Sequence, residues 1–201
     1  MLALRNYRQR EMTTVTKWKK QTLKLKDEHQ WKAREGYRIF VANRGAVRLD
    51  FPQHWVLKPG DNSFKFHDAE PPDDDCRLEL SINYLPPADW SCAPLADFLR
   101  GVADDDERPI NARGEIITEE RPNLRLAWIE LRFIDPVEQR TAHSRILLGI
   151  GGRVQCLLTF DYWADDDAEF APVWDEIVKS LQLGKIILDP TTGGMPDPRL
   201  N

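Results

Sequence analysis

Histidine is the residue type here best suited to metal binding and acid–base chemistry, so its spacing is informative. His29, His54, His67 and His143 lie far apart, and none shares an HxxxH, HxH or HExxH motif with another. A zinc site would therefore require the fold to assemble distant ligands. We expect structural roles instead, with the ring of His54 bonding a turn carbonyl, and we predict neither metal ligands nor a cofactor.

Aspartate occurs in three triplets, Asp73–Asp75, Asp104–Asp106 and Asp165–Asp167. Calcium needs about 6 to 8 oxygen ligands, which three converging loops can supply, although no triplet has the DxDxDG spacing of a self-sufficient loop. The third triplet is expected to cap a helix, and the first precedes a strand. The second follows a helix C-terminus, where negative charge is unfavourable. A divalent-metal-dependent protein using these Asp-rich loops remains an alternative.

The sequence offers little nucleophilic chemistry. Cys76, Cys92 and Cys156 fit neither a disulfide framework nor a CxxC pair, and we expect three reduced thiols. No serine has a GxSxG context. The glycine cluster at 149–152 lacks both GxGxxG and a phosphate-binding lysine, so it is interpreted as a hairpin turn. No catalytic residue is predicted, and we do not expect an enzyme.

Tryptophan and lysine carry the candidate binding chemistry. The chain has 7 tryptophans, two of them among lysines and a third in a loop before a helix. Exposed tryptophan is a favoured anchor at protein interfaces and also stacks on nucleic-acid bases. Core packing and partner contact both remain open for these side chains. The partner-binding candidates are Trp18, Lys19, Lys20, Lys24, Lys26, Trp31 and Trp90.

Charge divides the chain unevenly. Residues 1–48 hold 13 basic and 4 acidic residues, whereas residues 49–201 hold 15 and 29. The basic extension either folds against the acidic body or projects toward nucleic acid, a lipid surface or an acidic protein. Apolar residues such as Leu23, Leu25 and Trp31 favour the first interpretation. Met12 is a plausible second translation start, so none of these expectations depends on residues 1–11.

Composition indicates an ordinary globular protein. The 201 residues are 41% apolar with a net charge of −5, and a chain of this size buries roughly 70% of its surface. No run of 18 apolar residues or secretory signal is present, which predicts a cytoplasmic protein without membrane insertion. We expect a basic N-terminal extension over 1–36, an α+β domain over 37–188 and a Pro/Gly-rich tail over 189–201.

Period-two alternation dominates from Tyr37 to Trp163, as half-buried strands require. The expected strands cover 37–42, 46–51, 63–66, 76–85, 115–119, 124–134, 143–150 and 153–163. Amphipathic helices are predicted after Pro94, with a stripe of Leu95, Phe98, Leu99 and Val102, and from 167–171 to about Leu183. The 124–134 run changes phase, so it is buried on both faces or contains a bulge. The fold class is α+β, an antiparallel sheet flanked by two main helices.

The order of these elements resembles the PsbP-like fold, shared by the PsbP protein of photosystem II, a Ran-binding nuclear transport factor and several bacterial families. The likeness covers roughly 37–188 and is carried by Leu49-Asp50-Phe51-Pro52-Gln53-His54-Trp55, Phe160-Asp161-Tyr162-Trp163 and a helix with Phe170, Trp174, Ile177, Val178 and Ser180-Leu181. It implies an interaction module. The missing export signal and the unmatched basic segment argue against a photosynthetic role.

The predicted function is thus a non-enzymatic protein–protein interaction module, acting as an adaptor, chaperone or assembly component. Its partner is a protein or a second copy of the chain. The alternative is a nucleic-acid or anionic-surface binder that acts through the basic N-terminal segment.

Overall fold

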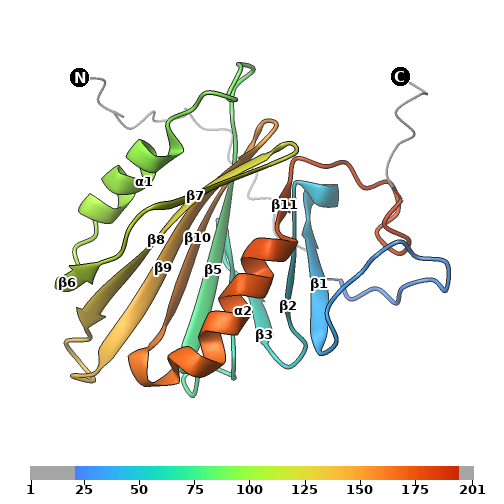
Figure 1. The fold of residues 1–201 in the computed structure, drawn as a ribbon. Coiled ribbons are helices and arrows are strands. Elements are labelled where there is room, and N and C mark those ends of the chain that lie inside the picture. The colour runs from blue at the N-terminus through green and yellow to red at the C-terminus, as the bar shows by residue number, and fades with distance from the viewer. Residues whose placement is uncertain (1–20, 195–201) are drawn as a thin grey trace.

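The computed structural model describes residues 21–194, which form two antiparallel sheets and two α-helices (Figure 1). The larger sheet has the strand order β3-β4-β5-β10-β9-β8-β6, and β7 also pairs with β8. Its strands are β3 (Val56–Pro59), β4 (Ser63–His67), β5 (Cys76–Tyr84), β6 (Ile110–Arg113), β7 (Ile117–Arg121), β8 (Leu124–Ile134), β9 (Thr141–Gly151) and β10 (Val154–Trp163). The smaller sheet is β1 (Tyr37–Ala42), β2 (Val47–Pro52) and β11 (Gln182–Leu183), in the order β1-β2-β11.

The two helices lie on opposite faces of the larger sheet. α1 (Leu95–Asp104) packs on a cluster from one face of β8 and β9, which includes Ile129 and Ile146. α2 (Asp167–Ser180) packs on the other face, where Leu158 and Phe160 join the inner residues of the small sheet. This confirms the predicted fold class.

The packing of β8 accounts for the change of phase in the apolar pattern of residues 124–134. Leu124 and Leu126 belong to the cluster under α2, whereas Ala127, Ile129 and Leu131 belong to the cluster under α1. The strand is therefore buried on both faces, because each helix needs an apolar floor. The irregularity of register lies in the neighbouring β6 instead.

Glycines at the turns allow the β1–β2 and β9–β10 hairpins to form. Short 3₁₀ helices, η1 (Asn43–Gly45) and η2 (Ala164–Asp166), follow β1 and precede α2. Gly45 and Gly152 have φ of +99° and +58°, a region that glycine enters without Cβ strain. Both glycines lie in hairpin connections, and the hairpin turn predicted at 149–152 is correct.

Three sequence expectations were wrong in detail. α2 ends at Ser180, because the chain then extends into β11. Its N-cap, Asp166, makes no side-chain capping bond. In α1 the buried residues are Leu95, Leu99 and Ala103, while Phe98 remains 38% exposed. The short strands β3, β6 and β11 had no alternation long enough to be recognised.

The described parts of the two chain ends pack together. Lys26 and Gln30 donate backbone hydrogen bonds to the carbonyls of Thr191 and Thr192, and residues 21–36 contain no helix or strand. None of the helices in the described part of the chain has the length and apolar character needed to span a bilayer.

Candidate functional site at the acidic end of the sheet

One end of the larger sheet gathers four segments that are far apart in the sequence. Cross-strand pairing joins Tyr162 to both Cys76 and His143, and it joins Phe133 to Ile110. The connections at these strand ends are residues 68–75, 104–109, 135–140 and 164–169, which we call the acidic sheet end. Figure 1 shows the β8–β9 connection and the start of α2 along the lower edge of the molecule.

The acidic sheet end carries a net charge of −13, close to the −14 of residues 49–201. Its four segments contain 15 acidic residues and 2 arginines. All three aspartate triplets lie in it, so the topology brings together what the sequence keeps apart. Such a concentration of one charge creates a potential that attracts cationic groups.

A network of arginines and aspartates forms the floor of this end. Arg108 contacts Asp106 at 2.6 Å and Asp161 at 3.1 Å, donates to the hydroxyl of Ser144 at 2.9 Å, and lies over the ring of Phe133. The hydrogen bonds from Arg108 hold the pKa of Asp106 below its ordinary value. The carboxylates of Asp106 and Asp161 are therefore paired with Arg108 within the protein, and their role is structural.

A shallow pocket of about 250 Å³ lies beside this network, and its lining includes Asp75, Asp135, Phe133 and Trp163. The indole of Trp163 donates to Asp75 at 2.8 Å, and Arg140 lies over its ring. Asp74 contacts the buried His67 at 2.7 Å.

Apolar side chains are exposed at the same end. Val137, at the tip of the β8–β9 hairpin, is 82% exposed, and Ile134 is 46% exposed. Asp73 and Glu138 are exposed on two of the four connections at this end. This end thus combines long-range negative charge with apolar surface for short-range contact.

On the opposite face of the same end, His143 lies within a polar cluster. Its Nδ1 is 3.2 Å from the Tyr162 hydroxyl, which donates to Asp167 at 2.7 Å. Arg145 donates to Glu130 at 2.9 Å and to Asp167 at 3.3 Å. Burial raises the pKa of Tyr162. The cluster ties the first residue of α2 to β8, β9 and β10.

This cluster contains residue types that can ligate a metal ion. Within residues 21–194, Glu130, His143 and Asp167 place possible ligand atoms within 4.8 Å of one another. The guanidinium of Arg145 already bonds both carboxylates. Because a cation would compete with that positive charge, the arrangement supports a structural ion-pair network better than a metal centre.

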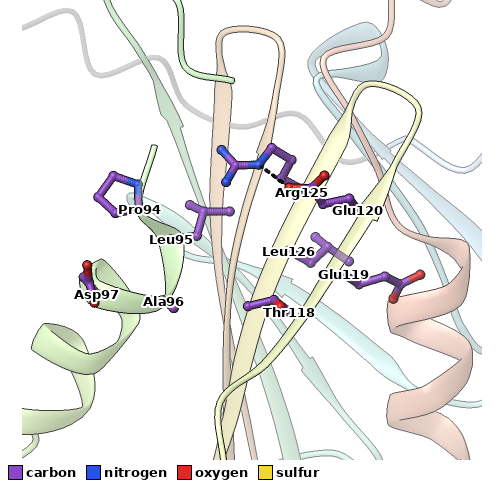
Figure 2. Close-up of a pocket in the computed structure, with 9 residues that line it drawn as sticks. All are labelled: Pro94, Leu95, Ala96, Asp97, Thr118, Glu119, Glu120, Arg125 and Leu126. Atoms are coloured by element: carbon purple, nitrogen blue, oxygen red, sulfur yellow. Dashed lines mark hydrogen bonds and ion pairs between the residues drawn. The ribbon is translucent and has the colours of Figure 1, made fainter. Parts of the chain in front are cut away.

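A second pocket, of about 210 Å³, lies between the start of α1 and the β7–β8 hairpin (Figure 2). Arg125 contacts Glu120 there and donates to the carbonyls of Trp90 and Ala93. Trp90 donates its indole N–H to Pro86 and packs partly against the cluster under α1. Trp90, one of the partner-binding candidates, therefore helps to hold the loop before α1 in place.

Residues 21–194 include three other candidates, all on the paired chain ends. Trp31 donates to the carbonyl of Pro190 at 2.8 Å, and its ring lies over Arg48. Lys26 contacts Asp189 at 2.9 Å, and Lys24 is exposed. Trp18, Lys19 and Lys20 lie outside the described residues.

Sequence reasoning missed Arg108, Asp161, Ile134 and Val137 as parts of a site. The aspartate triplets were the available signal, but only strand register shows that they share one end of a sheet with these side chains. The exposed hairpin tip had no local signature, because its exposure depends on how far β8 and β9 extend.

Two comparisons place the chain among related sequences. The Alr1449 family model matches residues 38–187. The uncharacterized protein alr1449 of Nostoc sp. is 53% identical over 182 residues, which are 90% of this chain and 95% of that protein.

Solved structures add a likeness of fold. LpqN, involved in cell envelope biogenesis of Mycobacterium tuberculosis, has a TM-score of 0.51 at 11% identity, over 73% of this chain and 89% of that chain. Cyanobacterial PsbP from Synechocystis has a TM-score of 0.48 at 12% identity, over 76% and 95%. The Ran-binding protein Mog1p of Saccharomyces cerevisiae has a TM-score of 0.46 at 8% identity, over 73% and 95%. The neighbours include both protein types that the sequence resembles, and at these identities the likeness is one of fold alone.

Proposed function

The chain belongs to the Alr1449 family, and we propose that it is a non-catalytic protein-binding module whose acidic sheet end receives a basic segment of a partner. One observation carries this proposal. The fold concentrates 15 acidic residues and 2 arginines on four segments beside the exposed Ile134 and Val137.

The physical roles of these groups differ. Carboxylates on exposed connections, such as those of Asp73 and Glu138, attract and orient a cationic segment, which raises the rate of encounter. The exposed Val137 supplies apolar area that a tryptophan or aliphatic side chain can cover. Asp106 and Asp161 are bound to Arg108 and hold the surface in shape. The preferred ligand is therefore a lysine-rich segment that contains aromatic residues.

A titration with a fluorescent peptide of alternating Lys and Trp tests the proposal. We expect the full chain to bind the peptide, and the double variant Asp73→Lys, Glu138→Lys to bind about tenfold more weakly because attraction becomes repulsion. The matched control, Asp61→Lys with Asp175→Lys, changes the charge equally at exposed positions outside the acidic sheet end and should bind like the natural chain. Absent binding, or equal weakening in both variants, would refute the proposal.

A second candidate function rests on the basic surplus of residues 1–48, which hold 13 basic against 4 acidic residues. These residues are suited to a nucleic acid or another anionic surface. Filter binding across a salt series tests it, because phosphate contacts give an affinity that falls steeply with salt. Weak binding that does not change with salt would remove this candidate.

A further inference from the structure

We infer that the protein makes a peripheral contact with an anionic lipid bilayer through the end of the larger sheet opposite the acidic sheet end. This inference goes beyond the proposed function and is independent of it, because it concerns a different surface. Figure 1 shows the β9–β10 connection and the segment after β11 along the upper edge of the molecule. The surface, which we call the cationic sheet end, consists of Arg44, Tyr84, Arg153, Lys185, Ile186 and Leu188.

The short helix η1 joins two parts of the cationic sheet end. Asn43 donates from Nδ2 to the hydroxyl of Tyr84, at the end of β5, with a separation of 2.8 Å. On the other side of η1, the backbone N–H of Lys185 donates to the carbonyl of Gly45 at 3.1 Å. The end of β5 and the segment after β11 therefore flank the same three residues.

The β9–β10 hairpin completes this surface. The backbone N–H of Leu85 donates to the carbonyl of Arg153 at 2.8 Å, and Nε of Arg153 donates to the carbonyl of Leu85 at 3.1 Å. Gly184 lies so close to the hairpin that a Cβ on it would clash with the carbonyl oxygen of Gly151. The four segments thus form one continuous surface, although they are far apart in the sequence.

Apolar side chains are exposed on the cationic sheet end. Ile186 and Leu188 are 64% and 67% exposed, whereas Ile187 between them is 4% exposed. Tyr84 is 62% exposed. Aliphatic groups at such exposure gain free energy when they leave water, and a tyrosine ring is suited to the boundary between hydrocarbon and water. These side chains are the groups that an apolar phase would take up.

The charged residues of the same segments are all cationic. Residues 43–46, 84–85, 151–154 and 184–188 contain Arg44, Arg153 and Lys185 and no acidic residue. Within residues 21–194, none of these three side chains forms an ion pair. Arg108 and Arg145, at the other end of the sheet, are bound to carboxylates. The cations of this end therefore remain available to an anionic surface.

An anionic bilayer complements both kinds of group at once. Its headgroup phosphates attract lysine and arginine, and the boundary of its acyl chains lies within reach of apolar side chains beside them. A nucleic acid would neutralise the cations but would leave Ile186 and Leu188 in water. The combination of unpaired cations with exposed aliphatic groups therefore favours a bilayer.

The distribution of charge also determines the orientation on a bilayer. β5 extends from Cys76 at the acidic sheet end to Tyr84 at the cationic sheet end, a length of about 27 Å for nine residues. This length exceeds the screening distance of about 8–10 Å in physiological salt. The acidic sheet end, with its net charge of −13, is repelled by the bilayer and points toward the solvent. It remains accessible to a basic partner while the protein is bound.

Flotation of the full chain with lipid vesicles tests the contact. We expect binding to vesicles of phosphatidylcholine and phosphatidylglycerol in equal parts, and binding at least about tenfold weaker to phosphatidylcholine alone. Arg44→Glu with Arg153→Glu and Lys185→Glu should weaken binding to the mixed vesicles at least about tenfold. Ile186→Ser with Leu188→Ser should weaken it about tenfold, because the apolar contribution is lost.

The matched control is Arg34→Glu with Arg100→Glu and Arg132→Glu, which changes the charge equally at exposed positions outside the cationic sheet end. It should bind the mixed vesicles like the natural chain, and thermal unfolding checks that each variant is folded. Absent binding to the mixed vesicles, or equal weakening by the control, would overturn the inference. A single-stranded oligonucleotide that binds this surface while the vesicles do not would assign the surface to nucleic acid instead.

An environment-sensitive fluorophore tests the orientation. Cys92→Ser removes the exposed thiol, and Ile186→Cys or Glu138→Cys then allows one label at either end of the sheet. With the mixed vesicles, we expect the emission of the label at residue 186 to move to shorter wavelength and that at residue 138 to stay unchanged. A shift at residue 138, or at neither position, would overturn the inference.

Discussion

Arg145 shows how one side chain joins two elements. Its guanidinium donates to Glu130 on β8 and to Asp167 at the start of α2, and the side chain is 10% exposed. Pairing with these two carboxylates offsets the cost of burying the Arg145 guanidinium. The contact links the first residue of α2 to β8 and β9.

Replacement of Arg145 by Met should lower the free energy of unfolding by about 3 kcal/mol, because two partly buried carboxylates lose their common cation. Arg132→Met is the matched control, since Arg132 contacts the same Glu130 but is 54% exposed; it should cost under about 1 kcal/mol. Urea denaturation of both variants measures the difference. Equal losses would contradict the role given to Arg145.

Asp50 and Arg48 form a buried ion pair beneath the paired chain ends. The carboxylate and the guanidinium are 2.7 Å apart, and Arg48 also bonds the carbonyls of Ser180 and Lys32. Burial raises the pKa of Asp50 from 3.8 to about 6, although Arg48 opposes the shift. The folded state therefore binds a proton that the unfolded chain has released between these pH values.

The contribution of Asp50 to stability should be full below about pH 4 and should be lost as the pH rises through 6. Asp50→Asn removes this titration. From pH 4 to pH 7, the free energy of unfolding of the natural chain should fall by about 1–3 kcal/mol relative to that of the variant. Denaturation over a pH series measures this difference, with the exposed Asp175→Asn as the control. Parallel pH profiles for the natural chain and Asp50→Asn would refute the assignment.

At the scale of elements, α1 depends on its contact with β8 and β9. Leu99 is fully buried in the cluster under this helix, whereas its neighbour Phe98 is 38% exposed. Leu99→Ala should lower the free energy of unfolding by about 2–5 kcal/mol through the cavity it leaves. Phe98→Ala should cost about 1 kcal/mol or less. If thermal or urea unfolding showed a larger loss for Phe98→Ala than for Leu99→Ala, the other face of the helix would be the buried one.

At the scale of the whole molecule, the distribution of charge is the dominant feature. A basic segment precedes a body whose negative surplus lies at one end of its larger sheet. Like charges on neighbouring connections repel one another and destabilise the compact state. Arg77, Arg108, Arg140 and Arg145 reduce that repulsion where they contact aspartates. A cationic ligand would reduce it further, which links stability to binding at this end.

The sequence determined those features that depend on local pattern. The alternation in Cys76–Tyr84 gave a strand with one buried face, and the spacing of Phe170, Trp174 and Ile177 gave a buried helix stripe. Hydrophobic periodicity and turn residues depend on near neighbours in the sequence, so a single sequence is enough to recognise them. The α+β class follows from the order of these elements.

Only the tertiary structure decided where distant segments meet. Short strands such as Gln182–Leu183 have too few residues for a period, and they form because β2 offers an edge. The sequence shows three aspartate triplets, but their common location follows from antiparallel register, which pairs Tyr162 with Cys76 and with His143. Register is fixed by burial on both faces of the sheet, a property that no local stretch of sequence contains.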